Sequence, residues 1–208
     1  MTMIGKSDGP TAVTVIKKNS KLTWKQKLEK CKYKIKRAYV EHTIKPKSHS
    51  LDEVIDYIVN RYGFVELHND KVCFEREELR ASFIMQYAPE LLGEYAAMPR
   101  LKSESREDIE AHMKQFQARQ QRAEEVPVSE FDIDFHKFQI SFDDINDNMY
   151  IIIEKRFAQI GGGVSGDKKQ MRRFHRIFKD VHRYYGVTAE DIKNKSKRYE
   201  QVIRALTR

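Results

Sequence analysis

The chain has few residues of the kinds that define several protein classes. It contains two cysteines, Cys31 and Cys73, in 208 residues. One pair of thiols without a partner motif predicts neither a disulfide framework nor a zinc site, so we expect two reduced, mostly buried thiols. The longest apolar runs, such as residues 149–153, are far shorter than the roughly 20 residues of a membrane-spanning helix. No signal-peptide pattern opens the chain. The sequence therefore predicts a soluble, cytosolic protein without membrane insertion.

No motif of a catalytic class is complete. Gly161 and Gly166 have the spacing of a phosphate-binding loop. However, Asp167 stands where that loop needs its lysine, so the pattern favours a mobile hinge. His68 and Cys73 could face each other across a small hairpin as base and nucleophile, but no orienting third residue accompanies them. We expect no catalytic residue and no cofactor, and we favour a non-enzymatic protein.

Two groups of potential metal ligands fail on spacing. Residues 143–148 hold three aspartates and two asparagines. Met149 and Lys155 stand where an EF-hand loop over these residues needs glycine and glutamate. His175 and His182 are seven residues apart on one predicted helix, about 10.5 Å along its axis, which is too far for a single metal ion. A solvated turn and two separate histidines are the preferred interpretations, and no metal is expected.

Charge is distributed unevenly along the chain, whose formal net charge is +8. Residues 17–47 contain 12 basic and 2 acidic side chains, and residues 168–208 contain 13 and 4. The intervening residues 48–167 contain 13 basic and 24 acidic side chains. This order has two physical interpretations. The basic ends can fold onto the acidic middle, or they can offer a positive surface to nucleic acid, a protein or another polyanion.

The hydrophobic pattern predicts an α+β protein with about six helices, two small antiparallel β-hairpins and an N-terminal extended arm. The arm covers residues 1–20, and residues 21–208 form a single compact domain, with a subdivision near 100–105 as the alternative. Helices are expected at residues 23–42, 50–63, 75–98 with a break at Pro89, 107–125, 167–185 and from 188 onward. In the first helix, apolar positions at four- and three-residue spacing form a stripe that places Cys31 and His42 in the core.

The strands are expected in two hairpins. The first joins residues 64–68 and 71–74 around the turn pair Asn69-Asp70. The second joins residues 131–142 and 149–160, and its alternation changes phase at His136-Lys137, which predicts a β-bulge or kink. Residues 161–166 are the flexible exit. Asp132 and Asp134 share one strand face, where we expect them to meet the basic helices.

The best candidate for polyanion binding is a basic stripe on the predicted helix at 167–185. Its members recur at helical spacing and have two tyrosines beside them: Arg172, Arg176, Lys179, Arg183, Tyr184 and Tyr185. Basic groups contact phosphates, and aromatic rings can stack on bases. Residues 184–192 are also similar to the opening of the DNA-binding domain of bacterial replication initiators, although the chain ends before the recognition helix of such a domain.

The N-terminal residues carry a resemblance to a known family. Ile4, Gly5, Asp8, Gly9, Pro10 and Thr11 match an Ile-Gly-Gly-Ala-Asp-Gly-Pro-Thr signature. That signature belongs to the beta subunit of sodium-pumping oxaloacetate and methylmalonyl-CoA decarboxylases. In that membrane family the aspartate belongs to the sodium path. Here Lys6 and Ser7 replace Gly-Ala and no membrane helices follow, so the sodium role of Asp8 does not carry over.

The whole chain resembles short soluble bacterial proteins that share this signature, through residues 51–63, 87–94 and 184–195 as well. Three hypotheses follow. The first is a non-enzymatic binding or accessory protein of unknown ligand. The second is a nucleic-acid-binding module that uses the basic helices. The third, implied by the resemblance, is a soluble accessory component of a sodium-pumping decarboxylase.

Overall fold

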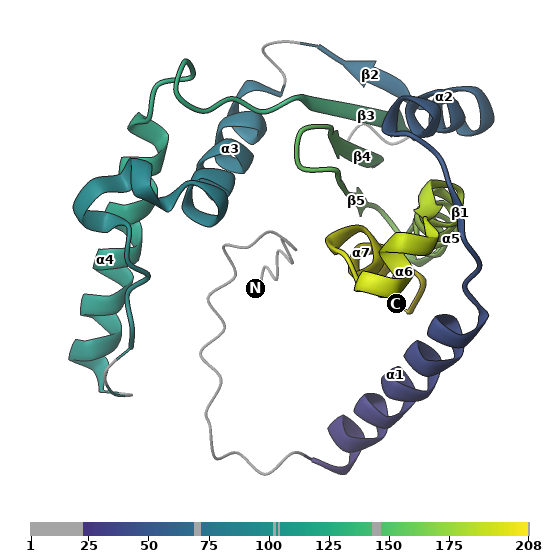
Figure 1. Cartoon of the computed structure of the whole chain (residues 1–208), viewed down its shortest axis with the longest axis horizontal. Helices are drawn as coiled ribbons and strands as arrows, with labels where there is room; N and C mark the ends of the chain where they lie inside the picture. The colour runs from purple at the N-terminus through teal and green to yellow at the C-terminus, as the bar shows by residue number, and fades with distance from the viewer. Residues whose placement is uncertain (1–22, 69–71, 102, 104, 143–146, 208) are drawn as a thin grey trace. The chain divides into compact units, whose positions relative to one another are not determined.

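A computed structural model describes residues 23–68, 72–101, 103, 105–142 and 147–207 (Figure 1). The N-terminal arm and the signature residues 4–11 lie outside these ranges. The described chain contains seven α-helices, one 3-10 helix, a two-stranded sheet and a four-stranded antiparallel sheet, so the predicted α+β class is confirmed. Among the helices of the described chain, none is long and apolar enough to cross a membrane.

Contacts divide the chain into two compact units. Of the described residues, unit 1 comprises 72–133, and unit 2 comprises 23–68 together with 134–207. Residues 100–105, where the sequence suggests a subdivision, lie inside unit 1. Unit 2 is therefore built from two separate stretches of chain, and unit 1 from the stretch between them.

Unit 1 is helical. It contains α3 (Cys73–Tyr87), the 3-10 helix η2 (Pro89–Tyr95) and α4 (Arg106–Glu125). The predicted break before Pro89 is confirmed, because proline cannot continue a helix but can open the next one. Apolar side chains from all three helices are buried, among them Phe83, Leu92 and Phe116.

Two buried arginines hold unit 1 together. Arg119 of α4 donates to the main-chain carbonyls of Met85 and Tyr95, both at 2.9 Å. These carbonyls end α3 and η2, where helices leave acceptors without partners. Arg80 of α3 donates to the carbonyl of Val126 at 2.8 Å and pairs with Glu77 at 2.7 Å. Each guanidinium thereby joins segments that are distant in the sequence.

The four-stranded sheet forms one side of the core of unit 2. Its order is β2 (Val65–Leu67), β3 (Phe135–Ser141), β4 (Asn148–Glu154) and β5 (Gln159–Ser165), all antiparallel. One face buries alternate residues, including Phe138, Met149, Ile151, Ile153 and Ile160. This face packs in one cluster with residues of the unit 2 helices.

Helices cover that face and carry the site described below. They are α2 (Leu51–Tyr62), α5 (Lys168–Tyr185) and α7 (Lys197–Thr207), with the short α6 (Ala189–Asn194) before α7. Val54 of α2, Phe174 and Val181 of α5, and Val202 of α7 belong to the core cluster. Capping boxes begin α2 at Ser50 and α5 at Asp167. The expected starts of both helices are confirmed.

A two-stranded sheet connects the residues that follow α5 to the segment that precedes α2. Its strands are β1 (Lys47–Ser48) and β6 (Gly186–Val187). Gly186 has φ 58°, and a Cβ there would lie 1.8 Å from the Lys47 carbonyl oxygen. Only glycine fits this approach. Arg198 of α7 donates to the Gly186 carbonyl at 2.9 Å and to the His49 carbonyl at 2.8 Å.

The first predicted hairpin is wrong. Cys73 begins α3, and β2 pairs with β3, where Leu67 lies opposite Lys137. Residues 71–74 are too few for alternation to distinguish strand from helix. The strong helical sequence that follows extends back to Cys73, because adding a residue to an existing helix is favourable. The predicted pairing of His68 with Cys73 is lost with the hairpin.

The glycine run is a strand and not a flexible exit. Gly161, Gly162 and Gly163 lie in β5, paired with β4. A Cβ on Gly162 would lie 2.5 Å from the Tyr150 carbonyl oxygen and 3.3 Å from the Phe174 ring. Glycine in a strand often marks such a close approach. Gly162 lets α5 pack against the sheet through Phe174, and Gly163 leaves room for the Tyr150 side chain.

Two smaller predictions are also corrected. The β3–β4 register is regular from Phe135 to Ser141, so no bulge occurs at His136-Lys137. The change of phase arises because Phe131 and Ile133, both buried, belong to unit 1. The last predicted helix is two helices, α6 and α7, separated at Lys195, whose φ is 47°.

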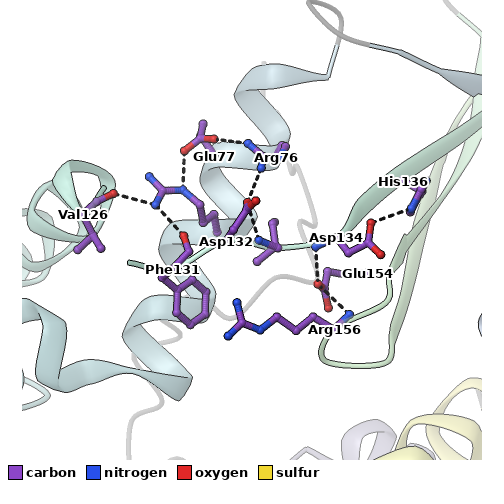
Figure 2. A network of polar contacts seen from close by, with 11 residues as sticks. Arg76, Glu77, Val126, Phe131, Asp132, Asp134, His136, Glu154 and Arg156 are labelled. Atoms are coloured by element: carbon purple, nitrogen blue, oxygen red, sulfur yellow. Dashed lines mark hydrogen bonds and ion pairs between the residues drawn. The ribbon is translucent and has the colours of Figure 1, made fainter. Parts of the chain in front are cut away.

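Buried and paired acids organise the turns shown in Figure 2. Glu154 is fully buried, and its carboxylate accepts from the main-chain nitrogens of Asp134 at 3.0 Å and Phe157 at 2.7 Å. Within unit 1, Asp132 pairs with Arg76 of α3 (Figure 2). Asp134 contacts His136 on β3 at 3.0 Å. The two aspartates that share a predicted strand face thus have partners on α3 and β3.

Helix α1 (Trp24–Thr43) begins at its expected cap, Thr23, but presents its apolar stripe differently from the prediction. None of its residues is buried. Cys31 and His42 are exposed, as is Cys73. The expectations of buried thiols and of a core histidine are therefore wrong, because α1 contacts α7 through another face.

Candidate polyanion-binding site

Helix α5 brings basic side chains to one face of unit 2. Arg172, Arg176 and Arg183 are exposed and Lys179 is half-buried. Their spacing of four, three and four residues aligns them along the helix, as the sequence predicts. The opposite face of α5 is buried in the core, so the stripe points away from the sheet.

A surface pocket of about 620 Å³ lies where this stripe meets α2. We call it the basic pocket. Its lining residues come from two helices: Arg61 and Tyr62 from α2, and Arg173, Arg176, Ile177, Lys179, Asp180 and Arg183 from α5. Five of these side chains carry positive charge. Among the described residues that line the pocket, Asp180 is the only acid.

Hydrogen bonds from α2 occupy the carboxylate of Asp180. The Tyr57 hydroxyl donates to Oδ2 at 2.6 Å, and the Tyr62 hydroxyl donates to the same oxygen. Arg61 Nε lies 3.6 Å from it. Burial opposes ionisation of Asp180, but the two hydroxyls and the charges of Arg61 and Arg183 outweigh it, so the pKa of this carboxyl lies below its usual value.

The same contacts keep the tyrosines protonated. Burial, followed by the bond to Asp180, raises the pKa of Tyr57 and that of Tyr62. Both hydroxyls therefore remain donors to Asp180 across the physiological pH range. These hydrogen bonds fix α2 against α5. The single negative charge of Asp180 offsets one of the five positive charges in the pocket.

Lys179 shows that the cations are crowded. Burial, together with the charges of Lys36 on α1 and of Arg183, lowers the pKa of the Lys179 ammonium. Like charges held together disfavour the charged form, and a bound anion would relieve that repulsion. Lys36 extends the positive region from α5 to α1.

The two tyrosines predicted to stack on bases are packed inside unit 2. The Tyr184 ring lies between His49 at 3.9 Å and Tyr57 at 4.0 Å, in parallel stacks. Tyr185 is 2% exposed, and the Arg198 guanidinium lies 3.8 Å from its ring centre. Their rings are used to hold α2, α5 and α7 together.

The other candidates from the sequence do not assemble a site. His182 is buried, and its Nδ1 lies 2.9 Å from the Phe178 carbonyl oxygen, whereas His175 is exposed. Residues 143–146 of the aspartate-rich turn lie outside the described ranges. Across the described part of the chain, no group of three or more potential ligands could hold a metal ion.

Sequence reasoning missed four polar members of the pocket: Arg61, Tyr62, Arg173 and Asp180. Arg173 and Asp180 lie on the predicted helix, one position away from the stripe. Arg61 and Tyr62 depend on how α2 packs against α5, which periodicity within either helix does not encode. A search of protein families, curated proteins and solved structures found no match to this chain.

Proposed function

We propose that this protein is a non-enzymatic binding protein whose ligand is a nucleic acid, held through its phosphates by the basic pocket and the α5 stripe. The observation that carries the proposal is the convergence of Arg61, Arg173, Arg176, Lys179 and Arg183 on one pocket. Their single acidic neighbour is already bonded to two tyrosines. Such a surface suits a polyanion better than a small neutral ligand.

The contacts favour the phosphate backbone over the bases. Arginine binds phosphate through two parallel N–H donors, and phosphate contacts carry no sequence information. Tyr184 and Tyr185, which could have stacked on bases, are engaged inside unit 2. We therefore propose binding that depends strongly on salt and weakly on sequence.

The test is fluorescence anisotropy with a labelled DNA duplex, a single strand and an RNA of mixed sequence, titrated at several salt concentrations. The double variant Arg176→Gln/Arg183→Gln removes two pocket cations. Each phosphate contact contributes about 0.9 to the slope of log affinity against log salt. We expect that slope to fall by about two and the low-salt affinity to fall by about tenfold or more.

A matched control removes two charges elsewhere. Lys114 and Arg122 are exposed on α4 of unit 1. Lys114→Gln/Arg122→Gln changes the net charge by the same amount and should leave the slope unchanged. Equal losses in both doubles would reject the basic pocket as the site, and absence of wild-type binding at low salt would reject nucleic acid as the ligand.

The proposal of a decarboxylase accessory component rests on residues 4–11, which lie outside the described structure. It stays a prediction from the sequence. Co-purification of the tagged chain with the pump subunits, in a cell that contains both, would support it. A failure to co-purify, with nucleic-acid binding intact, would leave the basic pocket as the functional site.

A further inference from the structure

Helix α1 exposes a continuous apolar stripe. We define the α1 stripe as the apolar and neutral residues that recur at four- and three-residue spacing: Trp24, Leu28, Cys31, Ile35, Ala38, Tyr39 and His42. Trp24 is 79% exposed, Ile35 66% and Tyr39 69%. Seven aligned side chains of this kind in water are unusual, because a surface helix normally buries its apolar face.

Helix α1 is held to α7 and to the core of unit 2 by the side opposite the α1 stripe. Arg37 donates to Glu200 of α7 at 2.8 Å and to Glu41 at 2.7 Å. Val40 packs against the unit 2 core. At 100° per residue, Arg37 and Val40 lie on the side of α1 opposite Ile35. The attachment to α7 therefore leaves the α1 stripe facing away from the core of unit 2.

Lysines border the α1 stripe on both sides. Lys27 and Lys34 follow one edge, and Lys25 and Lys32 follow the other. Ammonium groups on flexible stems can reach past an apolar face to anionic groups at its edge. An occupant must therefore combine an apolar surface with negative charge around it.

We propose that α1 lies on the surface of an anionic lipid bilayer without crossing it. A helix of this kind places its apolar face at the boundary between headgroups and acyl chains, while its lysines contact anionic headgroups. The α1 stripe supplies tryptophan, leucine, isoleucine and tyrosine for that boundary. The four bordering lysines supply the headgroup contacts.

Charge argues against the other occupants. A second copy of α1 would place lysines beside lysines. Residues 1–22 contain four lysines and one aspartate, so they share the sign of the surface they would cover. A nucleic acid would satisfy the lysines but offers no apolar surface for the whole α1 stripe. The bilayer satisfies both features.

The test uses Trp24, because it is the only tryptophan in the chain. The full-length protein is mixed with vesicles of phosphatidylcholine that contain phosphatidylglycerol, or with vesicles of phosphatidylcholine alone. We expect the Trp24 emission to shift to shorter wavelength and to become protected from acrylamide quenching with the anionic vesicles only. Co-sedimentation measures the partition in parallel.

Two variants separate the apolar and basic contributions. Leu28→Glu/Ile35→Glu should abolish the emission shift, because it places charge in the α1 stripe. Lys25→Gln/Lys32→Gln/Lys34→Gln should weaken the partition on the order of 100-fold, since each lysine near an anionic surface contributes about a fivefold factor. The substituted residues are exposed, so both variants should fold, which circular dichroism verifies.

The pocket double Arg176→Gln/Arg183→Gln is the matched control. It should lose nucleic-acid affinity and keep the Trp24 shift, while the Leu28→Glu/Ile35→Glu variant should show the reverse. No shift with anionic vesicles would overturn the proposal. A short-wavelength emission in the free protein, together with a dimer by light scattering, would also overturn it and identify a second copy as the occupant.

Discussion

At the residue scale, Gly161 and Gly162 are neighbours in β5 that meet different surroundings. A Cβ on Gly162 would approach the Tyr150 carbonyl oxygen to 2.5 Å, whereas nothing lies within 4 Å of one on Gly161. We expect Gly162→Ala to lower the free energy of unfolding by about 2 kcal/mol or more, because the main chain at Tyr150 cannot easily shift to make room for the methyl group. Urea unfolding measures the change.

Gly161→Ala is the control in the same strand. It adds the same methyl group into open space, so its free energy of unfolding should match the wild type or exceed it slightly, since alanine restricts the unfolded chain. Equal destabilisation by the two substitutions would show that β5 needs glycine for its backbone and not for close packing against α5.

Asp180 predicts a pH dependence. Its pKa in the folded chain lies below the ordinary value of about 4, so its contribution to stability is present above that value and is lost as the pH falls through the folded pKa. We expect Asp180→Asn to be less stable than the wild type at neutral pH, and the difference to vanish in acid. Urea unfolding across a pH series tests this.

Asp56→Asn gives the comparison for Asp180, because Asp56 is an exposed aspartate on α2. It should show little difference from the wild type at any pH. A gap between wild type and Asp180→Asn that persists unchanged in acid would mean that the side chain acts through its shape, and the hydrogen bonds from Tyr57 and Tyr62 would then carry no charge-dependent stability.

At the scale of elements, most helices could be predicted from the sequence and most strand partners could not. Thr23, Ser50, Asp167 and Thr188 each cap a helix that begins where the sequence predicts, because capping is decided by residues three positions apart. The partner of β2 lies about 70 residues along the chain. No local pattern encodes that pairing, so the nearer hairpin was preferred.

The residues of the candidate site also divide into those that the sequence predicts and those that it does not. Arg172, Arg176, Lys179 and Arg183 could be found because one helix carries all four at regular spacing. Arg61 could not, since its place in the pocket depends on tertiary packing. The exposure of the α1 stripe could not be predicted either. The stripe has the periodicity of a buried face, and periodicity alone does not tell which partner, if any, covers it.

Arg119 is expected to hold the helices of unit 1 together. Arg119→Ala removes a buried guanidinium and leaves the carbonyls of Met85 and Tyr95 without their donor, and should cost about 2 kcal/mol or more. Hydrogen exchange in α3 and η2 should accelerate. The exposed pair Arg122–Glu125 lies on the same helix, and Arg122→Ala should cost less than about 0.5 kcal/mol.

If Arg119→Ala were as stable as Arg122→Ala, the bonds to the helix ends would not stabilise unit 1. Arg119 is 5% exposed, and this burial lowers the pKa of its guanidinium, because a desolvated charge is unfavourable. Its hydrogen bonds to carbonyls must therefore offset that penalty in the folded state. This balance is what the substitution measures.

At the scale of the whole molecule, unit 1 is inserted between two paired strands of unit 2. Leu67 of β2 lies opposite Lys137 of β3, so the two ends of the insertion leave neighbouring strands. We expect that replacing residues 69–133 with Asn-Gly converts β2 and β3 into a simple hairpin with a short loop between Leu67 and Lys137, because the two strands are already paired at these residues.

The shortened chain should keep a cooperative unfolding transition and the nucleic-acid affinity of the full protein, since the basic pocket lies wholly in unit 2. Circular dichroism and anisotropy measure both. A shortened chain that unfolds without a transition would show that unit 2 needs unit 1 for its stability. Full stability with lost affinity would place part of the nucleic-acid surface in unit 1.

The pairing of β1 with β6 has a consequence for synthesis. Lys47 and Ser48 pair with residues that the ribosome adds about 140 positions later. Unit 1 is complete at residue 133, so every contact within it can form while α5, β6 and α7 are still untranslated. Unit 1 can therefore fold before the C-terminal residues are translated. The basic helix α1 can pack against α7 only after the last residues of the chain have been made.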